Sequence, residues 1–246
     1  MRKLLSGLTL SMVLALAAPA IGSEGGYRLD RAPIDPNDLV SRQAGARTFV
    51  NYCLNCHSAQ YMRYNRLQEL GLTEQQIKDN LILTGDKVGD TMRVAMSSKD
   101  AKSWFGVPPP DLSVVARSRG ADWLYTYLRT FYRDPGTASG WNNAVFPNVA
   151  MPHALWSLQG QRSLEMVKQG KGEHAALEYK WVQLAPGSQS VIEYDRTVRD
   201  LVNFLAFVAE PGAQTRKQIG IIVLFVLGIL FILAYLLKRE FWKDVH

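Results

Sequence analysis

Cysteine and histidine are scarce in this chain of 246 residues, which contains two cysteines and four histidines. Both cysteines lie within one segment of five residues, so neither is left for a disulfide to a distant part of the chain. A structural zinc site needs four ligands, and outside that segment only His153, His174 and His246 remain, none in a paired spacing. The chain also lacks an internal repeat and a long acidic run. These absences exclude a disulfide-rich module and a repeat protein, and they disfavour a zinc module.

The two cysteines belong to Cys53-Leu54-Asn55-Cys56-His57, a C-x-x-C-H sequence. This sequence is the attachment motif of a c-type haem, in which two thiols add to the vinyl groups of one porphyrin and the adjacent imidazole becomes the proximal iron ligand. A thioredoxin-like dithiol needs a βαβ context, whereas the flanks here predict helix. A disulfide between these two cysteines would be short and strained in that helix. We therefore predict one covalently attached haem c on Cys53, Cys56 and His57.

Residues 1–22 have the organisation of a secretory signal peptide. Arg2 and Lys3 form a charged start, residues 4–17 form an apolar run, and small residues over 18–22 offer a cleavage site. An uncleaved anchor helix is the alternative. Haem is attached to C-x-x-C-H after export, so the signal and the motif point to the same compartment.

A second apolar run, residues 219–237, contains 19 residues without a charge. As a helix it would be about 28 Å long, close to the thickness of a bilayer core. A buried core helix is the alternative, but the run is apolar on all sides and follows the end of the domain. Basic residues flank it at positions 216, 217, 238, 239 and 243. We predict a single transmembrane anchor whose basic C-terminal tail stays inside.

These two runs divide the chain into four predicted parts. They are a signal peptide at 1–22, a haem domain at 23–214, an anchor at 215–238 and a tail at 239–246. The formal charge of the chain is +6, but seven basic and two acidic residues lie outside 23–214, which leaves 21 basic against 20 acidic residues inside it. The domain is nearly neutral, so the charge belongs to the membrane-flanking segments and does not indicate nucleic-acid binding.

Two helices are expected to frame the haem. The first begins near Asn37 or Asp38, either of which is a good N-cap, and runs towards Cys53. Gly45 interrupts it at a cost of about 1 kcal/mol relative to alanine, which a close helix crossing would justify. The partner is predicted at residues 198–209, where apolar residues recur at helical spacing. A first and last helix crossing beside a haem is the frame of a mostly α, class I cytochrome c-like domain with loop insertions.

The stretch between these helices predicts less regular structure. Further helices are expected at residues 74–83, 114–116 and 122–132, the last one aromatic. Residues 84–105 read as a polar surface excursion and residues 134–148 as a loop. A hairpin is predicted from residues 179–182 and 191–194 around a Pro-Gly-Ser turn at 186–188.

The sixth iron ligand decides between electron transfer and ligand chemistry, and a methionine there raises the reduction potential. Met151 follows a long loop, precedes the stiffening Pro152 and lies 94 residues after His57, enough chain to reach the other side of a haem. Met62 is too near His57, Met92 and Met96 lie in the polar excursion, and Met166 lies in a predicted helix. Methionine is more often core filler than ligand. His153 is a serious alternative that these residues alone do not exclude.

Four features together resemble the cytochrome c1 family, the haem-bearing subunits of the quinol–cytochrome c oxidoreductase (bc1) complex. They are the segment Phe-Val-Asn-Tyr-Cys-Leu-Asn-Cys-His at 49–57, Pro-Pro-Asp-Leu at 109–112 with Arg117 and Arg119 behind it, Ala-Met-Pro at 150–152, and the C-terminal span. The resemblance covers essentially the whole mature chain. The C-x-x-C-H motif alone is shared by every c-type cytochrome, so the other features narrow the family.

The resemblance implies that Met151 is the sixth ligand, that Arg119 neutralises a haem propionate and that Pro110 lines the haem edge. It also implies an electron-transfer subunit with no bond-making site of its own. Electrons would come from a Rieske iron–sulfur subunit and pass to a c-type cytochrome, in a dimeric complex that also contains cytochrome b. The simple signal peptide favours a bacterial inner membrane with the haem domain in the periplasm.

Mitochondrial members of that family present acidic surfaces to a basic acceptor, whereas this domain is nearly neutral, which leaves the acceptor open. A membrane-tethered cytochrome of a dehydrogenase or a terminal oxidase would have the same chemistry with other neighbours. A haem enzyme or gas sensor with an open sixth site is an alternative of another class, against which the Met151-Pro152 pair argues.

Overall fold

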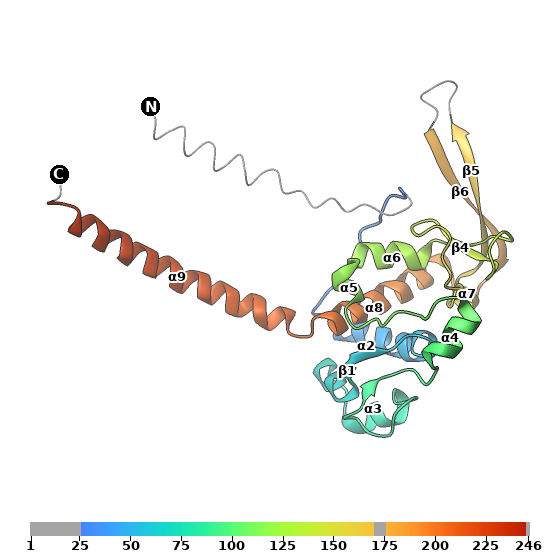
Figure 1. Cartoon of the computed structure of the whole chain (residues 1–246), viewed down its shortest axis with the longest axis horizontal. Helices are drawn as coiled ribbons and strands as arrows, with labels where there is room; N and C mark the ends of the chain where they lie inside the picture. Colours follow the sequence, from blue (N-terminus) through green and yellow to red (C-terminus); the bar gives the residue numbers. More distant parts are fainter. Residues whose placement is uncertain (1–25, 170–175, 245–246) are drawn as a thin grey trace.

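The computed structural model describes residues 26–169 and 176–244, so the predicted signal peptide lies outside the described residues. Figure 1 shows a domain of short helices from which helix α9 (Ala213–Phe241) and the hairpin of β5 (Gly160–Gln169) and β6 (Ala176–Pro186) project in different directions. Residues 26–38 contain neither helix nor strand, in agreement with their Gly-, Pro- and Asp-rich sequence.

Helix α2 (Leu39–Thr48) leads directly into the cysteine motif. Asp38 caps it, because its carboxylate accepts a hydrogen bond of 2.9 Å from the backbone N–H of Ser41. The helix continues as a π-helical turn, η1 (Phe49–Cys53), in which the N–H of Leu54 donates to the carbonyl of Phe49. Such wide turns occur mostly inside helices and often at functional sites. The predicted helix from residue 37 or 38 to Cys53 is confirmed.

Helix α2 crosses helix α8 (Val191–Ala209) at close range. A Cβ atom on Gly45 would lie 2.0 Å from the backbone oxygen of Asp200, so only glycine permits this approach. On either side of the crossing, the Phe49 and Phe204 rings lie 5.6 Å apart, and the Ser41 hydroxyl donates to the Asp200 carboxylate at 2.7 Å. The close helix crossing that was predicted at Gly45 is confirmed.

Helix α8 begins with a capping box in which Ser190 and Glu193 bond each other's backbone N–H groups. Because of this cap, residues 191–194 form the first turn of α8 and not a strand. The predicted hairpin between 179–182 and 191–194 is therefore wrong. Residues 179–182 do form a strand, but it belongs to β6 and pairs antiparallel with β5, with Val182 opposite Ser163. A capping box satisfies backbone donors that a strand would leave for a neighbour.

Helices α5 (Val115–Ser118) and α6 (Ala121–Arg129) pack on α8, and the small hairpin of β3 (Phe131–Arg133) with β4 (Trp141–Asn143) contacts β5. The aromatic helix predicted over 122–132 is confirmed for residues 122–129. The prediction of an irregular loop over 134–148 is partly wrong, because β4 lies within it.

The rest of the chain completes the core from the other side of α2. This part contains β1 (Ala59–Arg63), η2 (Tyr64–Leu70), α3 (Glu74–Asn80), β2 (Thr91–Met92) and α4 (Ser98–Phe105), and α7 (Trp156–Gln159) precedes β5. The predicted helix at 74–83 is confirmed over 74–80. The expected surface excursion at 84–105 is wrong in part, since Met92 in β2 is buried. Met166 lies in β5, so the helix predicted around it is also wrong.

Helix α9 is 29 residues long, has no buried residue and has a mean hydropathy of 3.1 over an 18-residue stretch. It begins after Glu210-Pro211-Gly212, where α8 ends, and contains the predicted span at 219–237. An apolar helix with none of its residues buried by the described part of the chain is stable in lipid and not in water. The fold is therefore mostly helical, with one apolar helix suited to anchor it in a membrane.

Candidate haem site

Cys53 ends the η1 turn, and Cys56 lies in the tight turn that follows, where the N–H groups of Cys56 and His57 both donate to the Cys53 carbonyl. Both thiols are free. Burial raises the pKa of Cys53 to about 12 and also raises the pKa of Cys56. At neutral pH both groups are therefore protonated thiols.

His57 is 9% exposed, and its Nδ1 lies 2.7 Å from the carbonyl oxygen of Pro110. A carbonyl only accepts, so Nδ1 carries the proton and Nε2 keeps its lone pair for a metal. Burial lowers the pKa of His57, which keeps the ring neutral. The tautomer and orientation of this imidazole are those of a proximal iron ligand.

The Pro-rich segment is fixed beside the motif by its own hydrogen bonds. Leu112 donates from its backbone to the Ser58 carbonyl at 2.7 Å, and Asp111 accepts from the backbone N–H of Gln60 at 3.0 Å. Pro110 therefore has a role that sequence reasoning missed, which is to orient His57 through its backbone carbonyl. The predicted position of Pro110 at the haem edge stays a prediction.

Met151 is half-buried and belongs to the same apolar cluster as Cys53 and Leu54. Its Sδ accepts a hydrogen bond of 3.3 Å from the hydroxyl of Tyr127, a residue of α6. Burial raises the pKa of Tyr127, so the hydroxyl keeps its proton and can donate. Two lone pairs on the thioether leave one for a metal while the other accepts from Tyr127.

The wall beside Met151 is aromatic. The ring of Trp123 stacks on Tyr127 with centroids 4.7 Å apart, and Phe146 meets Trp123 edge-on at 6.4 Å. Arg119 is exposed at the outer end of this wall, with its guanidinium 5.1 Å from the centre of the Trp123 ring. This geometry suits a cation at the rim of an apolar pocket. The predicted contact of Arg119 with a haem propionate stays a prediction.

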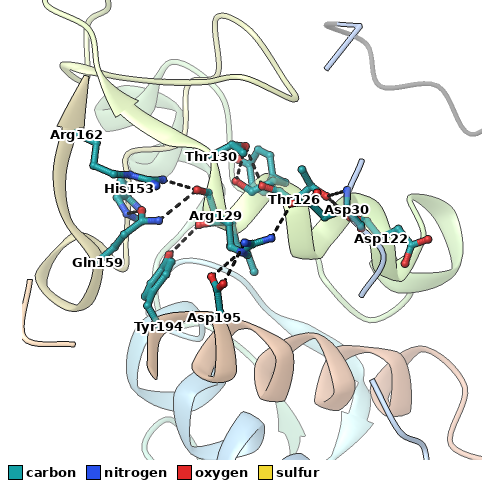
Figure 2. Close-up of polar contacts among 12 residues, drawn as sticks. Asp30, Asp122, Thr126, Arg129, Thr130, His153, Gln159, Arg162, Tyr194 and Asp195 are labelled. Carbon is teal, nitrogen blue, oxygen red and sulfur yellow. Dashed lines mark hydrogen bonds and ion pairs between the residues drawn. The ribbon is translucent and has the colours of Figure 1, made fainter. Parts of the chain in front are cut away.

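His153, the alternative sixth ligand, is held inside the aromatic core. It is 2% exposed, its ring stacks flat on Phe131 at 4.8 Å, and its Nε2 bonds the side-chain oxygen of Gln159 at 2.8 Å (Figure 2). The geometry therefore favours Met151 over His153, because Met151 is partly exposed whereas His153 is enclosed. Sequence reasoning could not see this difference between residues two positions apart.

Together these residues fit a haem bound through two thioether bonds. The structure offers two free thiols in one turn, an imidazole whose Nε2 is free to coordinate, and a half-buried thioether held in place by a tyrosine. A helical domain with these donors and one lipid-compatible helix defines a membrane-anchored haem protein.

Comparison with known proteins identifies the family within this class. A model of the Cytochrome C1 family matches residues 31–245. A protein from Allochromatium vinosum named cytochrome c1 is 48% identical over 250 residues that cover all of both chains. A protein from Nitrosomonas europaea named ammonia monooxygenase gamma subunit is 51% identical over 96% of this chain and 97% of that one. Cytochrome c1 of Rhodospirillum rubrum is 26% identical over 95% of this chain and 94% of its own.

This chain belongs to the cytochrome c1 family. Members are the haem-bearing, electron-transfer subunits of the bc1 complex, so the chain is an electron-transfer component with a haem cofactor. The resemblance predicted from residues 49–57, 109–112 and 150–152 is confirmed.

Replacing Tyr127 with phenylalanine is expected to lower the midpoint potential while methionine ligation is retained. The hydroxyl withdraws electron density from the sulfur and thereby disfavours the ferric state, and a hydrogen bond of about 1 kcal/mol sets an upper limit of about 40 mV. Tyr125→Phe is the matched control, because Tyr125 packs against Arg129 on the same helix. Redox titration followed by absorbance measures both. An unchanged potential in the Tyr127 variant would show that the bond has no electronic role.

His153 makes the stability of the domain depend on pH. Burial lowers its pKa from 6.5 to about 3. Below pH 6.5 the unfolded chain therefore binds a proton that the folded chain does not bind until about pH 3, so stability falls as the pH falls through this window. His153 should change the free energy of unfolding by at most about 1.4 kcal/mol per pH unit. When the free energy of unfolding is measured in urea from pH 7 to pH 4, it should fall less steeply in His153→Phe than in the wild type. Equal slopes in the two proteins would contradict the argument that burial lowers the pKa of His153.

Proposed function

We propose that this chain binds one haem c, attached at Cys53 and Cys56, with His57 and Met151 as the iron ligands, and that it transfers electrons within a bc1-type complex. The observation that carries this proposal is the hydrogen bond from His57 Nδ1 to Pro110, because it directs Nε2 of the motif histidine to a metal. When bound, the haem supplies an iron that takes up and releases one electron.

The side chains divide the remaining tasks. His57 and Met151 would hold the haem iron, through the free Nε2 of His57 and the thioether of Met151. Tyr127 holds the Met151 sulfur, and Arg119 offers a guanidinium to a carboxylate at the rim. None of these roles makes or breaks a bond in a substrate, so the chain is the electron-transfer subunit of an oxidoreductase and has no bond-making site of its own.

The electron donor in this proposal is a Rieske iron–sulfur subunit, and the acceptor is a c-type cytochrome. Cytochrome b is the further partner, and the complex is a dimer. The family membership supports these neighbours. Because the haem domain has almost no net charge, we expect its acceptor to bind without strong attraction between opposite net charges.

The proposed placement follows from the two terminal segments. Residues 1–22 export residues 23–214 to the periplasm of a bacterium, residues 215–238 cross the inner membrane, and residues 239–246 remain in the cytoplasm. Lys238 and Arg239, in the last turn of α9, support an inside C-terminus.

The relative named as a subunit of ammonia monooxygenase gives a second candidate. In that case the same haem site would serve as an electron carrier beside an oxygenase. The full-length similarity to both relatives means that the site chemistry is common to the two candidates. The proteins that copurify with the chain distinguish between them.

Haem retention after denaturation tests the attachment site. Wild-type chain should keep its haem through denaturing electrophoresis, detected by peroxidase staining, and Cys53→Ala/Cys56→Ala should lose it. Asn55→Ala is the matched control, since Asn55 is exposed within the same motif and its side chain donates to the Asn51 carbonyl in the preceding turn. Loss of haem from the wild-type chain, or retention by the double variant, would contradict covalent attachment at these cysteines.

A further inference from the structure

A glutamine is one of the links between the segment that carries Met151 and the end of α6. The ring Nε2 of His153 lies 2.8 Å from Oε1 of Gln159, and Nε2 of Gln159 donates to the carbonyl of Arg129 at 3.2 Å (Figure 2). Because the amide nitrogen is directed to a carbonyl, the amide oxygen faces the imidazole, and the ring nitrogen is the donor. Gln159 therefore joins the Met151 segment to the last residue of α6.

The anchor at Arg129 is itself fixed from several directions. Its guanidinium bonds Asp195 of α8 at 2.6 and 3.1 Å and Asp30 of the N-terminal segment at 2.7 Å. Its carbonyl accepts a second hydrogen bond from Arg162 of β5. The paired, bidentate geometry of the guanidinium makes this point more rigid than an exposed salt bridge would be.

The same helix end reaches Met151 from the other side. Tyr127 precedes Arg129 by two residues, and its hydroxyl donates to the Met151 sulfur at 3.3 Å. Two sets of contacts therefore join Met151 to the end of α6. One runs through His153 and Gln159 to the carbonyl of Arg129, and the other is the hydrogen bond from Tyr127. The orientation of the Met151 thioether therefore depends on the hydrogen bonds of Gln159 as well as on Tyr127.

The surroundings of Gln159 allow its effect on the orientation of Met151 to be tested without unfolding the domain. Gln159 lines a surface cavity of about 490 Å³ together with Arg129, Arg162 and Tyr194. If the amide is removed, the Arg129 carbonyl keeps its hydrogen bond from Arg162. The cost is then confined to the Nε2–H of the buried His153, which loses its partner at about 1–3 kcal/mol. The fold should survive while the link to His153 is lost.

We propose that Gln159 is a positioning residue that holds Met151 in place as the sixth ligand by bracing His153 against the end of α6. This inference rests on the proposed ligand pair of His57 and Met151. It assigns to Gln159 a function in ligand retention, although Gln159 lies outside the haem-binding motifs.

The test compares Gln159→Leu with Gln189→Leu in the full chain, purified with its haem in mild detergent. Gln189 lines the same cavity, and its side chain accepts a hydrogen bond from Thr197 at 3.1 Å. Imidazole is titrated into the ferric protein, and displacement of Met151 is followed by loss of the sulfur-to-iron charge-transfer band. Loss of one hydrogen bond makes displacement about tenfold easier, so imidazole should bind Gln159→Leu about tenfold more tightly than wild type. Gln189→Leu should bind it as wild type does.

Wild-type affinity in Gln159→Leu would overturn the proposal. If that variant does not accumulate, His153→Phe decides the question, because it removes the donor and keeps a ring on Phe131. A tenfold tighter imidazole affinity in His153→Phe supports the brace, and an unchanged affinity overturns it. The wild-type spectrum separates this test from the proposed function: a ferric wild type without the charge-transfer band would refute Met151 ligation itself, whereas a band that is insensitive to Gln159 refutes only the brace.

Discussion

Replacing Met151 with leucine should lower the midpoint potential by more than about 100 mV and allow the ferrous protein to bind carbon monoxide. A thioether favours ferrous iron, and axial ligands tune haem potentials over a range of about 0.8 V. Leucine keeps the apolar volume of methionine but cannot donate to iron. The variant therefore removes the ligand while leaving the packing nearly intact.

Met92→Leu is the matched control for this prediction, because Met92 is fully buried in β2, opposite Ala59 just after the cysteine motif, and therefore tests packing near the site without changing Met151. Redox titration and a carbon monoxide difference spectrum measure both variants. An unchanged potential and no carbon monoxide binding in Met151→Leu would remove Met151 as the sixth ligand. The same changes in Met92→Leu would show that the assay reports packing and not ligation.

Replacing Gly45 with valine should destabilise the domain by about 3 kcal/mol or more. The new Cβ would lie 2.0 Å from the backbone oxygen of Asp200 and 2.7 Å from the Cβ of Phe204. The obstructing atoms belong to the backbone of Asp200 and to the Cβ of the buried Phe204, so no flexible side chain can move aside. Helices α2 and α8 must separate, and overpacking of this kind typically costs about 1–3 kcal/mol for much smaller intrusions.

Gly45→Ala should cost less, because alanine offsets part of the clash by gaining about 1 kcal/mol of helix propensity. Val40→Ala is the control on the same helix, at a side chain that is 74% exposed, and its effect should stay within about 0.5 kcal/mol. Urea unfolding of the purified holoprotein gives the free energies. Equal stability of Gly45→Val and wild type would mean that the helices do not cross as closely as described.

The sequence predicts the frame of this fold because short-range signals specify it. Asp38 reads as a helix cap, the residues from 198 onward form an apolar stripe, and Gly45 requires a close neighbour. Likewise, the C-x-x-C-H motif carries its chemistry in five adjacent residues, and the final helix is long, apolar and uncharged. Each of these signals can be read without knowing what lies across the core.

The contacts that refine the site are not local, and the sequence could not supply them. Tyr127 is visible as part of an aromatic helix, but its bond to Met151 joins residues 24 positions apart. The carbonyl of Pro110 looks like any other until the fold brings it to His57. The β5–β6 hairpin was missed because residues 160–169 mix polar and apolar side chains without a clear alternation, and the turn at 186–188 suggested the wrong partner.

The most direct test of the central claim is mild-detergent purification of the tagged chain from its native membranes, followed by a reduced-minus-oxidised spectrum. For a bc1-type complex we predict dithionite-reducible b-type haem at about two per c-type haem, with a Rieske centre in the same fraction. A c-type signal that is reproducibly alone, or that travels with subunits of an oxygenase, would contradict the bc1 assignment and leave a tethered electron carrier with another donor.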